Sequence, residues 1–143
     1  MQIAENILHI LAIIVLVAMA AKYGLAKGIQ SYHKEIIADD AVTGNTGLKL
    51  VMGASYQAIG AGALAVAIAY AVLVFRVAPV TGFGKGYAFL ITCVLALPAL
   101  ISTYRVEQTS GVKTPWRVVA VGIILAAAAY AISYAVQGPT ERI

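Results

Sequence analysis

The sequence predicts an all-α integral membrane protein: an antiparallel four-helix bundle with a short interfacial amphipathic helix after the first span. Composition is the first reason, because 62% of the 143 residues are hydrophobic and only 11% are charged, whereas soluble domains are about 25% charged. A chain this short exposes much surface for its volume and needs many polar residues to be soluble. Ten basic and six acidic residues cannot cover that surface. A water-soluble globule and a disordered chain are both excluded.

The second reason is that four long stretches contain no Asp, Glu, Lys or Arg. These stretches are residues 6–21, 50–75, 86–104 and 118–140. A helix needs about 20 mostly apolar residues to cross the hydrocarbon core of a bilayer. The expected spans, extended to their ends, are residues 3–25, 48–75, 86–104 and 116–137. We treat residues 1–143 as a single transmembrane domain.

The segment between the first two spans is too polar to cross a membrane, yet it has helical periodicity. Its apolar residues recur at steps of four, three and four, at Leu25, Ile29, Tyr32 and Ile36. Polar residues occupy the other faces, which is typical of an amphipathic continuation of the first helix or of a short helix lying in the membrane–water interface. Turn residues within 39–47 then separate this helix from the second span.

The basic residues are distributed unevenly between the two sides of the predicted bundle. Seven lie beside the loops that join spans one and two and spans three and four: Lys22, Lys27, Lys34, Lys49, Arg105, Lys113 and Arg117. Three lie on the opposite side: Arg76, Lys85 and Arg142. The positive-inside rule therefore predicts that both of these loops are cytoplasmic and that both chain ends lie outside.

The second span carries a polar triplet, Ser55, Tyr56 and Gln57, within a sequence of small and apolar residues. An unpaired amide in hydrocarbon costs on the order of a few kcal/mol, so we expect Gln57 to face another helix. The triplet is a candidate ligand or transport site. Alternatively, it belongs to a packing surface, because small residues let membrane helices approach closely. The candidate packing residues are Ala54, Ala58, Gly60 and Gly62.

Two further residues are expected to shape the last two spans. Pro98 lies inside the third span, where a proline removes a backbone hydrogen bond and kinks the helix. Trp116 begins the fourth span between Lys113 and Arg117, which is typical of an anchor at the depth of the lipid headgroups.

The remaining polar residues form no recognisable catalytic or metal-binding pattern. His9 and His33 are expected more than a helix length apart, which is too far to ligate one haem within a chain. The loop at 81–86 contains Gly-Lys but lacks the spacing of a phosphate-binding loop. The charge-free stretches hold no Asp, Glu, Lys or Arg, and such residues at depth are the usual mark of proton and ion paths across membranes. We therefore expect no catalytic residue, no metal, no cofactor and no nucleic-acid partner.

Three stretches together carry a resemblance to a known family. Residues 31–33 (Ser-Tyr-His) follow the first span, and residues 58–64 (Ala-Ile-Gly-Ala-Gly-Ala-Leu) lie in the second. Residues 98–100 (Pro-Ala-Leu) precede Thr-Ser-Gly-Val-Lys-Thr-Pro-Trp at 109–116. The chain resembles uncharacterised bacterial membrane proteins with four spans and a TG-x-TPW-like motif before the last helix, although here Ser110 interrupts the Thr-Gly pair. The resemblance implies a multi-pass protein of the bacterial inner membrane and brings no activity.

These observations favour a small, non-catalytic accessory or scaffold subunit that associates through its second span. The alternative is a small oligomeric transporter or channel, or a lipid- or quinone-binding protein, with a polar site around Gln57. The expected partners are the lipid bilayer and either a second copy of the chain or another membrane protein.

Overall fold

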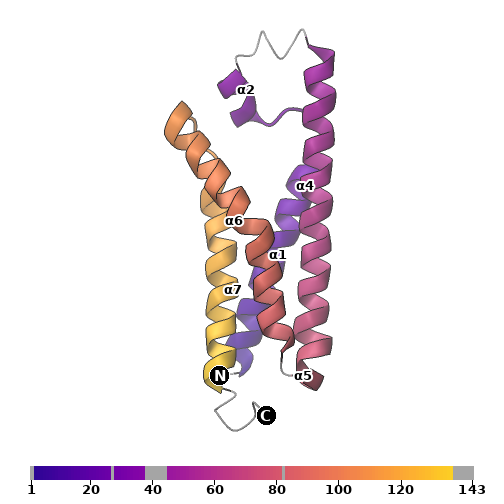
Figure 1. Ribbon diagram of the computed structural model, residues 1–143, viewed down its shortest axis with the longest axis vertical. Coiled ribbons are helices and arrows are strands. Elements are labelled where there is room, and N and C mark those ends of the chain that lie inside the picture. The colour runs from indigo at the N-terminus through magenta and orange to yellow at the C-terminus, as the bar shows by residue number, and fades with distance from the viewer. Residues whose placement is uncertain (1, 27, 38–44, 82, 137–143) are drawn as a thin grey trace.

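The computed structural model describes residues 2–26, 28–37, 45–81 and 83–136, and this part of the chain contains helices and no strand (Figure 1). Four of its helices are long and apolar enough to cross a membrane. They are α1 (Gln2–Gly24), α4 (Thr46–Val72) with its π-helical extension η1 (Leu73–Val77), α6 (Gly84–Ser110) and α7 (Trp116–Val136). The predicted all-helical class is therefore confirmed, and four helices have the length and composition of membrane spans.

The long helices lie side by side along the longest axis of the molecule (Figure 1). In that view the chain rises through α1, descends through α4, rises through α6 and descends through α7. Helix α1 packs against α4 and α7, and α6 closes the arrangement by packing against the same two helices. The lower end of the molecule is therefore where α1 begins and α7 ends, and the upper end carries the α1–α4 and α6–α7 connections.

Two short helices complete the described chain. Helix α2 (Ser31–Ile37) precedes α4 at the upper end, and α5 (Ala78–Thr81) follows η1 at the lower end (Figure 1). Helix α4 begins after Asn45, whose side chain accepts a hydrogen bond from the Leu48 amide at 3.0 Å, as an N-cap does. Helix α6 continues to Ser110, beyond the expected end at residue 104, and stops at Gly111, whose φ of 72° favours glycine.

A very close approach between two helices brings α4 onto α1. A Cβ atom on Gly60 would overlap the backbone of Gly24 and would lie 3.0 Å from the Ala20 carbonyl oxygen. Only glycine permits backbones to approach this closely. A second such contact sets Gly84, at the start of α6, against the Leu73 carbonyl of the π-helical turn. Both contacts lie within one chain, so these glycines serve the fold of the single subunit.

Helix α6 is bent, and its upper part leans away from α4 (Figure 1). Pro98 lies inside this helix, and proline at an interior position both removes a backbone hydrogen bond and displaces the preceding turn. The bend leaves the upper ends of α4 and α6 apart, whereas their lower ends are packed together around Gly84.

Candidate functional site

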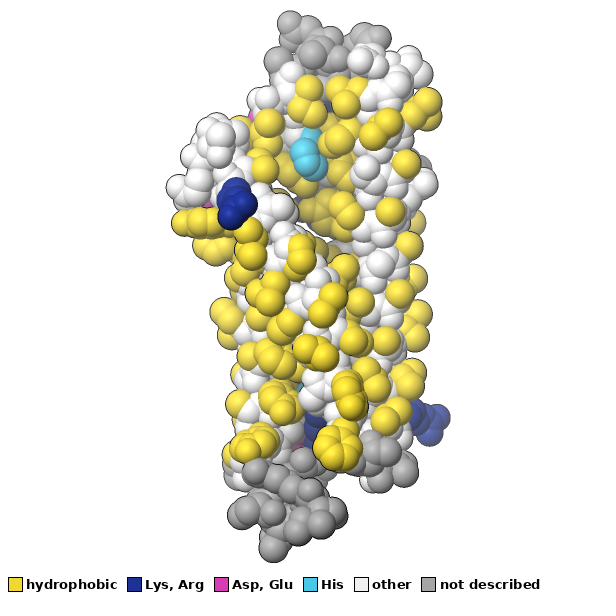
Figure 2. Space-filling view, viewed as in Figure 1, with side chains coloured by type: hydrophobic (Ala, Val, Ile, Leu, Met, Phe, Trp, Pro, Cys, Tyr) yellow, Lys and Arg dark blue, Asp and Glu magenta, His cyan; other side chains and the backbone are white. Residues whose placement is uncertain are grey.

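A cavity of about 520 Å³ lies at the upper end, between α1, α4 and α6 and beneath α2. Its long wall is aliphatic and comes from three helices, with Leu16, Met19, Ile59, Leu95 and Val106 among its residues. Figure 2 shows the surface hollowed between α2 and the upper part of α6, so the space is open on that side. Because α6 bends away, these helices leave a cavity between them instead of packing side chain against side chain.

Polar groups on the α6 wall are already satisfied by their own helix. The hydroxyl groups of Ser102 and Thr103 donate to the Ala99 carbonyl, at 3.1 and 2.6 Å. These are bonds from a side chain back to the preceding turn of the same helix, as Ser and Thr commonly make. The α6 wall therefore presents little unsatisfied polarity to the cavity.

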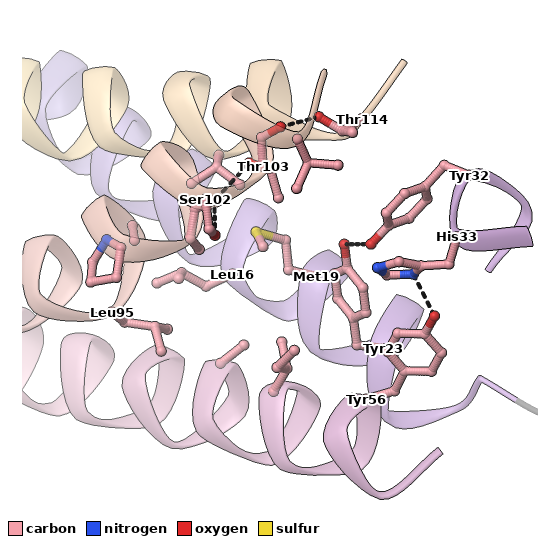
Figure 3. A pocket seen from close by; sticks show the side chains of 17 residues that line it. Leu16, Met19, Tyr23, Tyr32, His33, Tyr56, Leu95, Ser102, Thr103 and Thr114 are labelled. Atoms are coloured by element: carbon pink, nitrogen blue, oxygen red, sulfur yellow. Dashed lines mark hydrogen bonds between the residues drawn. The ribbon is translucent and has the colours of Figure 1, made fainter. Parts of the chain in front are cut away.

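Four aromatic side chains form the polar end of the cavity: Tyr23, Tyr32, His33 and Tyr56, which we call the tyrosine–histidine cluster (Figure 3). The hydroxyl groups of Tyr23 and Tyr32 are 3.3 Å apart. The Tyr56 hydroxyl lies 2.5 Å from Nδ1 of His33 and accepts the Gln30 amide at 3.3 Å. Adjacent rings are also in contact, with centroids 4.0 Å apart for Tyr32 and His33. The cluster joins α2 to α1 and α4.

The cluster is uncharged at neutral pH. Burial lowers the pKa of His33 below its usual value near 6.5, because desolvation disfavours the imidazolium. Burial also raises the pKa of Tyr32, since the phenolate would lose its hydration. Among the described residues that line the cavity, none is Asp, Glu, Lys or Arg. The site therefore offers neutral hydrogen-bonding groups at the end of an apolar space.

The lower end has a different polar arrangement, in which each of the four long helices supplies a side chain. We call this set the polar clasp: Glu5, His9, Tyr70, Lys85 and Ser133. The Lys85 ammonium pairs with the Glu5 carboxylate, which also accepts the Ser133 hydroxyl at 2.6 Å. Nδ1 of His9 is 2.8 Å from the Tyr70 hydroxyl, and its Nε2 lies 3.6 Å from Glu5. The clasp is buried, since Glu5, His9 and Tyr70 are each only 1% exposed.

The clasp was not predicted from the sequence. Glu5 and Lys85 lie just before two of the charge-free stretches and were therefore not considered as residues inside the bundle. The signal that could have found the clasp is helical spacing, since Glu5 and His9 lie on the same face of α1 as Ala12 and Leu16, which face the other helices. A carboxylate on the buried face of an apolar helix requires a cation from a neighbouring helix. Lys85, at the matching end of α6, supplies it.

The structure does not bring the predicted polar triplet together. Tyr56 is buried and belongs to the tyrosine–histidine cluster. Ser55 is exposed and donates to the Val51 carbonyl of its own helix at 2.9 Å. Gln57 is exposed on the outer side, where it lines a shallow groove between α1 and α4 together with Ala21. The three side chains leave α4 in different directions.

The predicted packing residues also lie on different sides of α4. Gly60 faces α1, as described above, whereas a Cβ atom added to Gly62 would lie 3.8 Å from Cδ1 of Leu95 on α6. Ala54 and Ala58 are exposed on the outer surface of this chain. The four residues therefore do not form one stripe.

Trp116 begins α7, as expected, and packs between two neighbours. Its ring meets Tyr104 edge-on with centroids 5.4 Å apart, and the Arg117 guanidinium lies 4.7 Å from the ring centroid. The Arg117 guanidinium also pairs with Glu107 at 2.9 Å. The start of α7 is thereby tied to the upper, bent part of α6.

Within the described ranges, no group of three His, Cys, Asp or Glu side chains could hold a metal ion. Comparison of the chain with protein-family models, curated proteins and solved structures finds no match.

Proposed function

We propose that this chain is a membrane protein that binds an amphipathic, lipid-like molecule in the cavity between α1, α4 and α6. The observation that carries the proposal is an apolar cavity that ends in a cluster of neutral hydrogen-bonding side chains. Its volume of about 520 Å³ lies within the range of small-molecule sites, about 300–1,000 Å³. An apolar body would lie along Leu16 and Leu95, and a polar head would meet the cluster.

The proposal includes an orientation in the bilayer. The four long helices form an antiparallel bundle across the membrane, with α2 in the interface at the upper end. The excess of basic residues beside the two upper connections favours a cytoplasmic location for that end. The cluster then lies at the depth of the lipid headgroups, and the aliphatic part of the cavity lies at the depth of the hydrocarbon core. This arrangement matches the polar head and apolar body of an amphipathic molecule.

The test is to identify what the purified protein retains. The chain would be extracted in mild detergent and washed exhaustively, and bound molecules would be measured by native mass spectrometry and organic extraction. We expect a stoichiometric lipid-like molecule on the wild type. Ala99→Phe places a ring in the cavity wall and should remove the bound molecule.

A matched control introduces the same phenylalanine at another position of α6. Leu97 is 43% exposed and does not line the cavity, so Leu97→Phe should retain the molecule. Equal retention by both variants, or no retained molecule on any of the three proteins, would reject the proposed function.

A second candidate function, self-association, has its own observation. Gln57 is exposed in a shallow groove otherwise lined by small and apolar residues, including Ala20, Gly24 and Ala61. A side-chain amide carries both a donor and an acceptor, so the same face of a second copy can satisfy it in a symmetric pair. In hydrocarbon this pairing replaces a costly unpaired amide.

Cross-linking in native membranes tests the second candidate. Gln57→Leu should abolish a cross-linked dimer, whereas Ser55→Ala should not, because the Ser55 hydroxyl is bonded to its own helix. A dimer that survives Gln57→Leu would exclude this face. A cross-link to a different membrane protein would identify the partner as an unlike subunit and exclude self-association here.

A further inference from the structure

The tyrosine–histidine cluster contains more hydrogen-bond donors than its internal bonds use. Tyr23 and Tyr32 share one hydrogen bond, at 3.3 Å between their oxygen atoms. Each phenol has one hydrogen, and a shared bond uses only one of the two. One O–H donor therefore remains at the polar end of the cavity.

His33 supplies a second donor. The Gln30 amide already donates to the Tyr56 oxygen, so we assign the Tyr56 hydrogen to the bond with Nδ1 of His33. Since burial keeps His33 neutral, its remaining proton is on Nε2. Figure 3 shows that the second ring nitrogen of His33 points away from Tyr56 and toward the cavity. The ring thus presents an N–H to whatever occupies the space.

The acceptor that fits these donors is neutral and flat. A phosphate or carboxylate head would require a cation, and the described lining contains none. A pure hydrocarbon would cover these two donors without pairing them, which costs free energy. The cluster is also built of rings, with centroids of His33 and Tyr56 5.4 Å apart and of Tyr23 and Tyr56 6.0 Å apart. Such a surface suits a planar ring that can stack on its neighbours.

We infer that the cavity binds a quinone with an apolar tail, whose ring carbonyls accept hydrogen bonds from His33 and from the Tyr23–Tyr32 pair. The inference rests on the proposed function and names the ligand class. The ester carbonyls of a diacylglycerol or a phospholipid share part of this chemistry, so the experiment must separate these sources.

The chain contains a single tryptophan, which provides a label-free probe. Trp116 lies in the chain between two residues that line the cavity, Thr114 and Val119. Quinones quench tryptophan fluorescence on close approach. The full chain in detergent would be titrated with a short-tailed benzoquinone, and the tail-matched alkylbenzene would be titrated as a competitor that lacks carbonyl groups.

We expect saturable quenching by the quinone and weak competition by the alkylbenzene. His33→Phe keeps a ring and removes the N–H donor, and the double change Tyr23→Phe with Tyr32→Phe removes both hydroxyl groups. Each should weaken quinone binding about two- to tenfold, the equivalent of one neutral hydrogen bond. Alkylbenzene competition should be unchanged, which shows that the cavity is still folded.

Three results would overturn the quinone assignment while leaving the proposed function in place. They are equal affinity for quinone and alkylbenzene, displacement of the quinone by diacylglycerol or phosphatidylethanolamine at equal concentration, and variants that bind quinone as tightly as the wild type does. Absence of binding by every compound, in protein shown to be folded, would reject both the inference and the proposed function.

Discussion

The two ends of the molecule hold their helices together by different means. At the lower end all four long helices supply a side chain to the polar clasp, and Gly84 lets α6 pack directly on the π-helical turn. At the upper end α6 leans away, and the tyrosine–histidine cluster links only α1, α2 and α4. A ligand site requires a region that can adjust, and such regions are drawn from the less stable parts of a fold. We therefore expect the helices at the upper end to move more easily than the helices at the lower end.

Removing one partner of the ion pair at the lower end should have the largest effect. Lys85→Met leaves the Glu5 carboxylate buried without its cation, and an uncompensated buried charge costs about 3–5 kcal/mol. Reversible unfolding in detergent would measure the loss. The double variant Glu5→Gln with Lys85→Met should recover most of the stability, because replacing both partners removes the charge. If the single and double variants are equally unstable, the clasp acts through packing and not through the ion pair.

A smaller effect is expected where α4 packs on the last residue of α1, next to the tyrosine–histidine cluster. Gly60→Ala adds a methyl group that overlaps the Gly24 backbone, and overpacking of this kind costs about 1–3 kcal/mol. Gly53→Ala is the control on the same helix, because nothing lies within 4 Å of its added Cβ. It should leave stability unchanged or raise it by up to about 1 kcal/mol through helix propensity. Equal effects of the two substitutions on thermal unfolding would contradict the close crossing.

The sequence was sufficient to predict the number of spans, because long charge-free runs depend on the bilayer and on no tertiary contact. It was also sufficient to place Pro98 inside a helix and to predict that the helix is kinked at that residue. The direction in which α6 leans depends on what packs beside it. Only the structure shows that this lean opens a cavity toward α2.

The two polar sites were harder to predict for different reasons. Glu5 and Lys85 lie 80 positions apart in sequence, and only the folded bundle brings them together. In the polar triplet, the direction of each side chain depends on the rotation of α4 about its axis. That rotation is set by the Gly60–Gly24 contact, which turns Tyr56 inward and Gln57 outward. Neighbours in sequence therefore reach different surfaces.

A matched pair of hydroxyl deletions compares the two ends directly. Tyr70→Phe removes the partner of buried His9 at the lower end and should cost about 1–3 kcal/mol, the range for a buried polar group left unpaired. Tyr56→Phe removes the hydroxyl between His33 and Gln30 at the upper end. Because His33 is only partly buried, water can replace that partner, and the cost should be about 0.5–1.5 kcal/mol. A larger loss for Tyr56→Phe in thermal unfolding would reverse the proposed order of rigidity.

The smallest effect expected is a pH dependence confined to the upper end. Burial holds the pKa of His33 in the folded chain below the value near 6.5 that it regains on unfolding. Between those two pKa values the unfolded chain binds more protons, so the stability contributed by neutral His33 is present above pH 6.5 and is lost as the pH falls below it. His33→Gln cannot titrate, whereas His9 is common to both proteins and its contribution cancels in the difference. The melting temperature of the wild type minus that of His33→Gln should therefore decrease as the pH falls from about 7.5 to about 5. A difference that is constant over this range would mean that His33 keeps its hydration in the folded protein, and that the upper end is more open than the cluster implies.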